Sequence, residues 1–329
     1  MAEHGGNSDE AAKAYGMTPE QMYDLSTGIS PIAYDMVLPS SSHYQKLPMT
    51  SALDDLYKAA RGAYQVPSHA DICGGAGSQS LLGMLPNVMA GSEIVWCREP
   101  TYNEHRYRWE KAGHQVDGGD SCPEDAKIII LGQPNNPDGR LWEHDEIAHY
   151  HEKMLERNGL LIIDEAFVDA MPEHSYTPHA GDDNLVILRS VGKFYGLAGI
   201  RVGFAIGGKE IIAKLADDIG PWPISQPAID IALTALSDHE WQISHSKRLY
   251  ELSSKLVEIL AGAGFTIVAQ QPLFVTIQDE SIYEFHDHLA RYGFWTRIYQ
   301  NYPSMMRLGL ISQQTDLSRF ASVVSRWQK

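Results

Sequence analysis

Three short segments contain residues whose side chains could take part in catalysis or ligand binding. Lys193 closes the motif Ser190-Val191-Gly192-Lys193 after an apolar run, and Arg201 follows eight residues later. Asp164 directly follows four apolar residues, where a carboxylate is costly to bury unless a cation meets it. The turn-rich string Pro134-Asn135-Asn136-Pro137 follows a third apolar run. An amine, a carboxylate and an amide are therefore expected close to the ends of buried strands.

Each segment alone also has an ordinary explanation. Lys193 could be a solvated loop lysine, Asp164 could cap a helix, and residues 134–137 could simply form a turn. A Ser-x-x-Lys motif could also indicate a serine nucleophile of the penicillin-binding type. That chemistry needs Ser-Asp-Asn and Lys-Thr-Gly partners, and neither string occurs in the sequence.

A glycine-rich segment could hold an anion. Gly74-Gly75-Ala76-Gly77-Ser78-Gln79 lies between a short apolar run and an apolar helical stretch. The Gly-x-Gly-x-x-Gly fingerprint of dinucleotide-binding proteins fails, because Ser80 occupies its last position. Backbone N–H groups at a helix N-terminus, together with the Ser78 hydroxyl, indicate a phosphate seat instead.

These residues need a scaffold that gathers strand ends. From about residue 51, runs rich in Ile, Val and Leu alternate with helical stretches. Such continuous runs are typical of strands buried on both faces, which predicts a mainly parallel sheet with helices on each side. Ligands bind at the carboxyl ends of such strands. The predicted strands are Asp71–Cys73, Glu93–Cys97, Lys127–Leu131, Leu160–Asp164, Leu185–Arg189 and Val202–Ile206, and the predicted helices are Ser51–Tyr64, Gln79–Met89, Glu104–Ala112 and Glu143–Arg157.

Two shorter parts flank this scaffold. Thr18-Pro19-Glu20-Gln21 predicts a capped helical turn in an N-terminal arm. A smaller α/β block follows about residue 264, with strands expected at Thr266–Val268, Phe274–Ile277, Trp295–Tyr299 and Met305–Leu310. The predicted division is therefore an arm and substrate- or dimer-contact segment (1–45), a large domain (46–220), and connecting helices with a small C-terminal domain (221–329).

Composition limits the possible partners. The 329 residues are 43% hydrophobic and 21% charged, which is typical of globular proteins. The formal net charge of −16 disfavours nucleic acid and anionic membranes as partners. The apolar runs are too short to span a membrane, and the polar N-terminal residues do not resemble a signal peptide. We therefore expect a cytoplasmic protein.

No metal site is expected. The cysteines Cys73, Cys97 and Cys122 are odd in number and widely spaced, which fits neither a disulfide framework nor a zinc site. His149 and His151 are two residues apart on a predicted helix and face different directions. We interpret these histidines as solvated.

Taken together and in order, the motifs resemble a known family. Pro-Asn-Asn-Pro at 134–137, Asp-Glu-Ala-Phe at 164–167 and Ser-x-x-Lys…Gly-x-Arg at 190–201 are similar to those of the aspartate-aminotransferase superfamily of pyridoxal-phosphate (PLP) enzymes. The resemblance covers nearly the whole chain. It implies the α/β, fold type I architecture of PLP-dependent transferases, with a mainly parallel central sheet and a smaller C-terminal α/β domain. The large domain would bind PLP.

The resemblance also implies roles for single residues. Lys193 would form a Schiff base with PLP, Asp164 would pair with the pyridinium nitrogen, and Asn136 would bind the ring hydroxyl. Tyr102 would stack on the ring. The cofactor phosphate would be held by Ala76, Gly77, Ser78, Ser190 and Arg201, with Tyr44 reaching over from a second subunit. A homodimer with shared active sites is therefore expected.

The N-terminal segment narrows the resemblance. His4-Gly5-Gly6-Asn7 and Tyr23–Pro31 are similar to threonine-phosphate decarboxylases of cobalamin biosynthesis, which are relatives of histidinol-phosphate aminotransferases. Phe167 agrees with this, because the aminotransferases usually place a tyrosine there. The substrate residues implied are His4, Gly6, Asn7, Arg297 and Arg307. The sequence departs from relatives at Gly28, Ser30 and Gly192, where asparagines or a hydroxyl are common.

The expected function is PLP-dependent decarboxylation of a phosphorylated amino acid, L-threonine O-3-phosphate. A phosphate is a suitable substrate anchor, because arginine forks recognise it in two-pronged geometry. Two alternatives remain open. The chain could be an aminotransferase acting on histidinol phosphate or a similar phosphorylated amine, or a catalytically silent PLP-fold module that acts as a binding partner.

Overall fold

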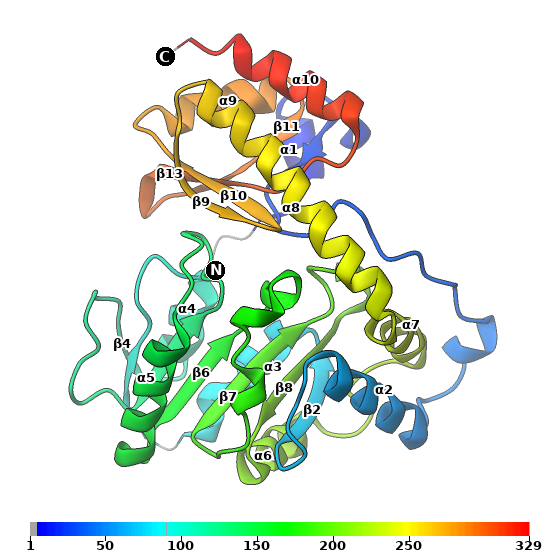
Figure 1. Ribbon diagram of the computed structural model, residues 1–329, viewed down its shortest axis with the longest axis vertical. Coiled ribbons are helices and arrows are strands. Elements are labelled where there is room, and N and C mark those ends of the chain that lie inside the picture. The colour runs from blue at the N-terminus through cyan, green and yellow to red at the C-terminus, as the bar shows by residue number, and fades with distance from the viewer. Residues whose placement is uncertain (1–4, 90, 329) are drawn as a thin grey trace. The chain divides into compact units, whose positions relative to one another are not determined.

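A seven-stranded sheet organises the larger of the two compact units into which the chain divides (Figure 1). The structure is a computed structural model that describes residues 5–89 and 91–328. The larger unit comprises Ala33–Asn136 and Arg140–Ile243, and the smaller unit comprises Met1–Ile32, Pro137–Gly139 and Ser244–Lys329. The predicted division at residues 45 and 220 groups the chain differently, and it stays a prediction about domains.

The large sheet is mainly parallel, as predicted. Its strand order is β2-β8-β7-β6-β5-β3-β4, and β8 runs in the direction opposite to the other six strands. The strands are β2 (Asp71–Ala76), β3 (Ile94–Trp96), β4 (Gln115–Asp117), β5 (Ile128–Gly132), β6 (Leu160–Asp164), β7 (Leu185–Ser190) and β8 (Val202–Gly207). Every residue of β5, β7 and β8 is buried, which explains why their sequences are continuously apolar.

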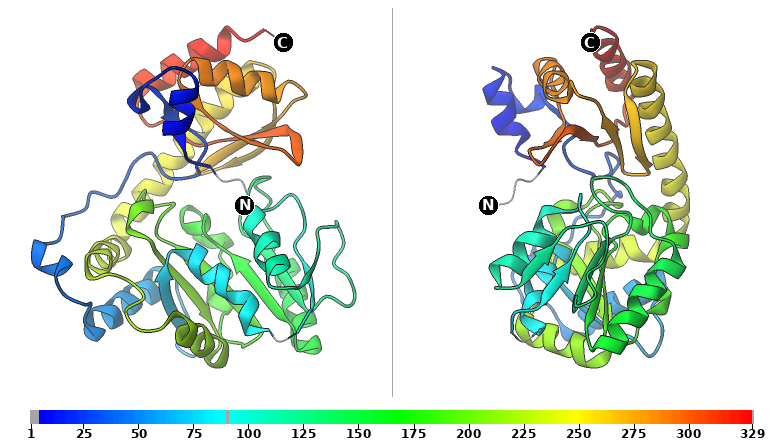
Figure 2. Two further views of the ribbon diagram at one scale, coloured as in Figure 1. Left: turned by 180° about the vertical axis from the view of Figure 1, so that it is seen from behind. Right: turned by 90° about the vertical axis from the view of Figure 1, so that its left-hand side faces the viewer.

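Helices cover both faces of this sheet, again as predicted. They are α2 (Thr50–Ala63), α3 (Ser78–Met84), α4 (Asn103–Lys111), α5 (His144–Arg157), α6 (Lys209–Ile219) and α7 (Gln226–Ser237). One hydrophobic cluster joins α3, α4 and α6 to one face through Leu81, Trp109 and Leu215. Helix α5 contacts β5 and β6 on the opposite side from α4 (Figure 2).

Helix α5 corrects one interpretation from the sequence. Its buried residues Ile147, His151 and Met154 recur at helical spacing, so His151 faces the core and is only 8% exposed. His149 is exposed, as expected for a solvated side chain. Among the described residues, no three His, Cys, Asp or Glu side chains are grouped as metal ligands.

Some element boundaries differ from the predicted ones. The helix expected at Gln79–Met89 ends at Met84 and continues as a 3-10 turn, Leu85–Val88, because Pro86 cannot continue an α-helix. The strand expected at Trp295–Tyr299 is divided into β11 (Phe294–Trp295) and β12 (Arg297–Tyr299). The edge strand β4 has only three residues and gave no apolar run to detect.

The smaller unit is built on a four-stranded antiparallel sheet of order β12-β13-β10-β9. Its other strands are β9 (Thr266–Gln271), β10 (Phe274–Gln278) and β13 (Tyr302–Leu308), and its helices are α1 (Ser8–Ala14), α9 (Ile282–Arg291) and α10 (Gln314–Ser325). Strand β1 (Tyr23–Asp24) pairs with β11, so the N-terminal segment folds with the C-terminal one. Helix α8 (His239–Gly262) begins in the larger unit and ends in the smaller one.

Several sequence-level expectations can be checked directly. Thr18 and Gln21 form the predicted capping box, with the Thr18 N–H donating to Gln21 Oε1 over 2.8 Å. All three cysteines are free, and burial raises the pKa of the Cys73 and Cys97 thiols to about 12. Across residues 5–89 and 91–328, no helix combines the length and apolar character needed to cross a membrane.

Candidate active site

Strand register brings the predicted site segments to one edge of the large sheet. Gly203 pairs with Gly75 on one side and with Ser190 on the other, so the ends of β2 and β7 flank the start of β8. Farther along the same edge, Asp164 at the end of β6 pairs with Gly132 at the end of β5. The residues that follow these strands therefore line one edge, as expected for a parallel sheet.

The glycine-rich segment and Arg201 are close enough to exclude side chains between them. Arg201 Nη2 donates to the carbonyl oxygen of Ala76 over 3.4 Å. A Cβ atom on Gly77, whose φ is +78°, would lie 2.9 Å from the same nitrogen, and a Cβ atom on Gly203 would clash with the Ser78 nitrogen. Glycine is required at Gly77 because of its positive φ, and at Gly203 because the Ser78 backbone approaches so closely.

Ser190 and Tyr57 complete the surroundings of this segment. Ser190 Oγ accepts the Gly192 N–H over 3.3 Å, and its strand neighbour Gly203 adjoins Ser78. The Tyr57 hydroxyl accepts the Gly74 N–H over 3.0 Å, and burial raises the pKa of this phenol to about 12. The structure thus gathers Ala76, Gly77, Ser78, Ser190 and Arg201, the residues predicted to hold the cofactor phosphate.

The carboxylate of Asp164 is held by two neighbours. Its Oδ1 accepts the Ala166 N–H over 3.1 Å, and its Oδ2 lies 3.0 Å from His105 Nε2. The His105 side chain is only 1% exposed. Sequence reasoning missed this histidine, because 59 residues separate it from Asp164 and only its position one helical turn after Tyr102 hinted at it.

A buried chain of hydrogen bonds fixes the proton on the far side of His105. Asn135 Nδ2 donates to the Pro100 carbonyl oxygen over 2.7 Å, so Asn135 Oδ1 faces Thr101 and accepts its hydroxyl over 3.0 Å. Thr101 has then used its only proton and must accept one from His105 Nδ1 over 3.0 Å. On the opposite side of the ring, Nε2 lies 3.0 Å from Asp164 Oδ2, so the hydrogen bonds to Thr101 and Asp164 together orient the imidazole.

A buried ion-pair cluster ties together the strand ends that carry Asp164 and Ser190. Arg189 Nη1 lies 2.8 Å from Glu165 Oε2, and Nη2 lies 3.2 Å from Asp169 Oδ1. All three side chains are at most 4% exposed. Burial raises the pKa of Asp169, and the neighbouring Arg189 charge opposes that shift. Glu165 follows Asp164 and Arg189 precedes Ser190, so the cluster fixes both positions.

Lys193 follows β7 and contacts an aromatic ring. Its Nζ lies 5.4 Å from the ring centroid of Phe167, which is buried three residues after Asp164. The lysine itself is half-buried, and so is Asn136, which directly follows the buried Asn135. Phe167 has no hydroxyl, so this position offers a ring face and no hydrogen-bond donor.

Tyr102 stands at the N-cap of α4, and its ring edge meets His105 with 5.6 Å between ring centroids. Tyr44 is different. It belongs to the short helix Ser41–Tyr44 and is 64% exposed. In the described part of the chain, no hydrogen bond or ring contact joins Tyr44 to the phosphate-seat residues.

The described residues among the predicted substrate positions lie in the smaller unit; they are Gly6, Asn7, Arg297 and Arg307. Arg307 on β13 is 6% exposed, donates from Nη2 to the Ser26 carbonyl oxygen over 2.7 Å, and faces Arg297 of β12 in the strand register. Ser26 Oγ also accepts the Gly6 N–H over 2.7 Å, which links Gly6 to the strand of Arg307.

Other predicted substrate positions are less connected. Asn7 is exposed and occupies the N-cap position of α1 with a φ of 55°, without a side-chain hydrogen bond to the helix. His4 lies outside the residues that the structure describes. Ser26, which sequence reasoning missed, is 281 residues away from Arg307 in the chain and gave no motif of its own.

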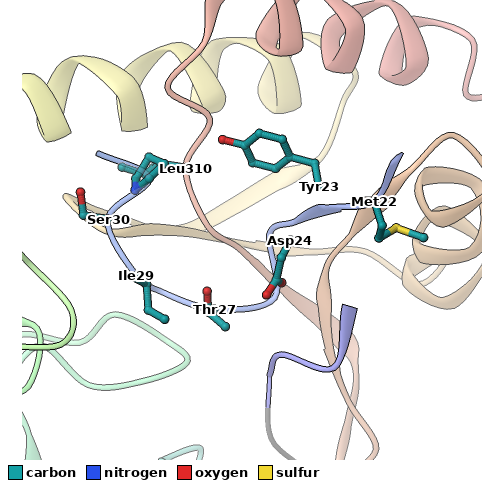
Figure 3. Close-up of a pocket in the computed structure, with 8 residues that line it drawn as sticks. Met22, Tyr23, Asp24, Thr27, Ile29, Ser30 and Leu310 are labelled. Carbon is teal, nitrogen blue, oxygen red and sulfur yellow. The ribbon is translucent and has the colours of Figure 1, made fainter. Parts of the chain in front are cut away.

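A cavity of about 360 Å³ lies beside the segment that departs from relatives (Figure 3). Its lining residues are Met22, Tyr23, Asp24, Thr27, Ile29, Ser30, Pro31 and Leu310. Ser30 Oγ donates to the Ile32 carbonyl oxygen over 2.8 Å and lies 3.0 Å from His245 Nε2. The Ser30 hydroxyl therefore anchors this loop.

Comparison with known proteins identifies the class of protein that this fold and site define. Residues 40–294 match the family described as aminotransferase class I and II, so the chain belongs to that family. It is 35% identical over 324 residues to threonine-phosphate decarboxylase from Pseudomonas aeruginosa, covering 97% of this chain and 96% of that protein. A threonine-phosphate decarboxylase from Sinorhizobium sp. is 32% identical, covering 99% of this chain and 98% of that protein.

A solved structure agrees with the fold. Histidinol-phosphate aminotransferase from Sinorhizobium meliloti, in complex with pyridoxal-5'-phosphate, superposes with a TM-score of 0.82 at 18% identity, covering 97% of this chain and 95% of that one. These comparisons confirm the predicted fold type I architecture. The family match and the two decarboxylase relatives also confirm the prediction of a PLP-dependent enzyme.

Proposed function

We propose that this chain decarboxylates L-threonine O-3-phosphate to (R)-1-aminopropan-2-yl phosphate in the cytoplasm, as a step of cobalamin biosynthesis. One observation carries the proposal: the similarity to two threonine-phosphate decarboxylases extends over nearly the full length of both. The phosphorylated substrate is consistent with two arginines, Arg297 and Arg307, that face each other across neighbouring strands.

The side chains of the larger unit fit PLP. Gly77, Ser78 and Arg201 offer a cradle that a Cβ atom would fill, with a cation and a hydroxyl suited to a phosphate dianion. Lys193 offers a primary amine, and Asp164 offers a carboxylate whose orientation His105 fixes. When bound, PLP supplies an electron sink for the carbon that loses carbon dioxide.

The residues of this chain would divide the work as follows. Lys193 Nζ would hold the cofactor in the resting enzyme and, when its amine is free, would hold the proton that is delivered to the substrate α-carbon. Asp164 would accept a hydrogen bond from the cofactor ring nitrogen and keep it protonated. Asn136 would bind the ring hydroxyl, and the phenyl face of Phe167 would contact Lys193 without donating a hydrogen bond.

Substrate selection would depend on the arginines. Arg307 would bind the substrate phosphate, which is doubly charged and suited to a guanidinium fork. Arg297, Gly6, Asn7 and His4 would assist it. If the arginines bind the substrate phosphate, they would leave the substrate carboxylate unclamped, as decarboxylation requires.

The expected partner is a second copy of this chain. Tyr44 lies in an exposed apolar segment whose members Val37, Leu38, Leu47 and Met49 are each at least 62% exposed. Single exposed apolar residues are ordinary, but a run of them favours an interface. In the proposed homodimer, Tyr44 would reach the phosphate seat of the other subunit.

The test is a product analysis with the holoenzyme. Incubation with L-threonine O-3-phosphate alone is expected to release carbon dioxide and form the aminopropanol phosphate, with no 2-oxo acid. Transamination of histidinol phosphate that depends on 2-oxoglutarate would show that the chain is an aminotransferase instead. Bound PLP that neither substrate converts would indicate a catalytically silent module.

A further inference from the structure

The side chain of Gln79 connects the stacking tyrosine to a buried carboxylate. The Tyr102 hydroxyl donates to Gln79 Oε1 over 2.9 Å, and Gln79 Nε2 donates to Glu104 Oε2 over 2.8 Å. Arg108 Nε donates to the same Glu104 oxygen over 2.5 Å. Gln79 belongs to α3, Glu104 and Arg108 belong to α4, and Tyr102 is the N-cap residue of α4; the two helices contact each other in the larger unit.

The direction of these hydrogen bonds follows from the groups themselves. Glu104 is only 2% exposed and is ion-paired with Arg108, so its carboxylate accepts hydrogen bonds and donates none. Gln79 must therefore turn its amide nitrogen toward Glu104 and its carbonyl oxygen toward Tyr102. The phenol proton of Tyr102 is then used by Gln79, so Tyr102 presents its ring to a ligand and donates no proton to it.

We propose that Gln79 and Glu104 are positioning residues that set the orientation of the Tyr102 ring. This inference rests on the proposed function, in which Tyr102 stacks on the cofactor. Gln79 directly follows Ser78 of the phosphate seat, so one short segment fixes both the seat and the hydroxyl of the stacking ring. A buried carboxylate is costly, and here it holds the amide of Gln79 in the one orientation that accepts the phenol.

The test exchanges the two side chains. Gln79→Glu places two carboxylates face to face and removes the donor to Glu104. PLP binding to the apoenzyme is expected to weaken by about threefold to tenfold, the effect of one lost hydrogen bond. The visible circular dichroism of bound PLP is expected to change as well.

In the exchange variant Gln79→Glu with Glu104→Gln, the new amide donates to the new carboxylate, which again accepts the Tyr102 hydroxyl. Affinity and spectrum are expected to return to within about twofold of the wild type.

A second variant shows whether the effect passes through Tyr102. Gln79→Leu is expected to weaken PLP binding by a similar factor in the wild-type background and to have no further effect in a Tyr102→Phe background. Independent, additive losses would overturn the proposal. Glu110→Gln is the matched control, because Glu110 is an exposed glutamate of α4, the helix that contains Glu104. This variant is expected to leave PLP binding unchanged.

The outcomes separate this inference from the proposed function. If Gln79→Glu binds PLP with wild-type affinity and spectrum, the positioning role is wrong and the proposed function stands. If the wild-type chain itself fails to bind PLP, the proposed function fails first. Far-ultraviolet circular dichroism of each variant identifies any that does not fold, and Gln79→Leu then serves in place of Gln79→Glu.

Discussion

Asp164 is the residue on which the proposed chemistry depends most directly. Its carboxylate is held by a backbone N–H group and by His105, so it is oriented before any ligand binds. Asp164→Ala is expected to cost about 2–5 kcal/mol of stabilisation at the reacting centre, because it removes a hydrogen-bonded charge partner. The measurement is kcat/KM for decarboxylation. Asp120→Ala is the control, since Asp120 is 87% exposed, and its activity is expected to be that of the wild type.

His105 gives a sharper residue-level prediction. His105→Phe removes a hydrogen bond to a charged group. Its kcat/KM is expected to fall by the factor that corresponds to a loss of about 1.5–3 kcal/mol of transition-state stabilisation, and the visible absorption of bound PLP is expected to shift. His105→Gln keeps a side-chain N–H donor and is expected to recover most of the loss. Equal defects in the two variants would show that the ring packs but does not position Asp164. His149→Phe, at an exposed histidine, is the control.

Residue types and spacing could predict part of the site and not the rest. Lys193, Asp164 and Asn136 follow apolar strands, and their motifs stand out in the sequence. His105 and Gln79 acquire their roles from neighbours that are 59 and 23–25 residues away. No local pattern marks such contacts, because they depend on which helix crosses which strand end.

At the scale of elements, continuous apolar runs predicted the buried strands well. Strand β6 has the predicted bounds, and β5, β7 and β8 each differ by one residue at one end or both. The two-residue strand β1 was not predicted, since its pairing with β11 is made across nearly the whole chain. A continuous apolar run indicates a strand that is buried on both faces, whereas a strand of two residues at a sheet edge is too short to give such a run.

The ion-pair cluster behind β6 and β7 gives a prediction about stability. Arg189→Met removes the one guanidinium that both Glu165 and Asp169 contact, which leaves two buried carboxylates without it. The free energy of unfolding is expected to fall by about 3–5 kcal/mol, measured by urea denaturation. Arg291→Met breaks a solvent-exposed pair with Asp287 and is expected to cause no measurable loss. Similar stability of the two variants would contradict the role of the cluster.

At the scale of the whole molecule, His286 links stability to pH. Burial lowers its pKa from 6.5 to about 4, and its Nδ1 lies 2.7 Å from Thr296 Oγ1. Below pH 6.5 the unfolded chain takes up a proton that the folded chain does not, so stability is complete above pH 6.5 and is lost as pH falls through 4. The loss is expected to reach about 3 kcal/mol.

The measurement is the unfolding free energy of wild type and His286→Gln between pH 4 and 7. The variant has no imidazole to protonate, so its stability is expected to fall less steeply over this range. The quantity compared is the slope of the unfolding free energy against pH in the two proteins, since other groups titrate in both. Parallel slopes would show that His286 does not contribute.

The net charge of −16 also belongs to this scale. It disfavours anions at long range, yet both proposed anion sites are built around arginines, Arg201 in one unit and Arg307 in the other. Charge attraction over more than about 10 Å is screened at physiological salt, so local geometry selects the ligand.

The pairing of β2 with β8 has a consequence for how the protein is made. The phosphate seat combines residues at and just after the end of β2, Ser190 at the end of β7 and the arginine before β8. It therefore cannot form until the ribosome has released all three strands. The bond from Arg307 to Ser26 spans 281 residues and completes later still. Long-range pairings of this kind form slowly, because the chain loses conformational entropy before the new contacts stabilise it. During synthesis, the segment around Ser26 therefore stays without these partners until nearly the whole chain has been released.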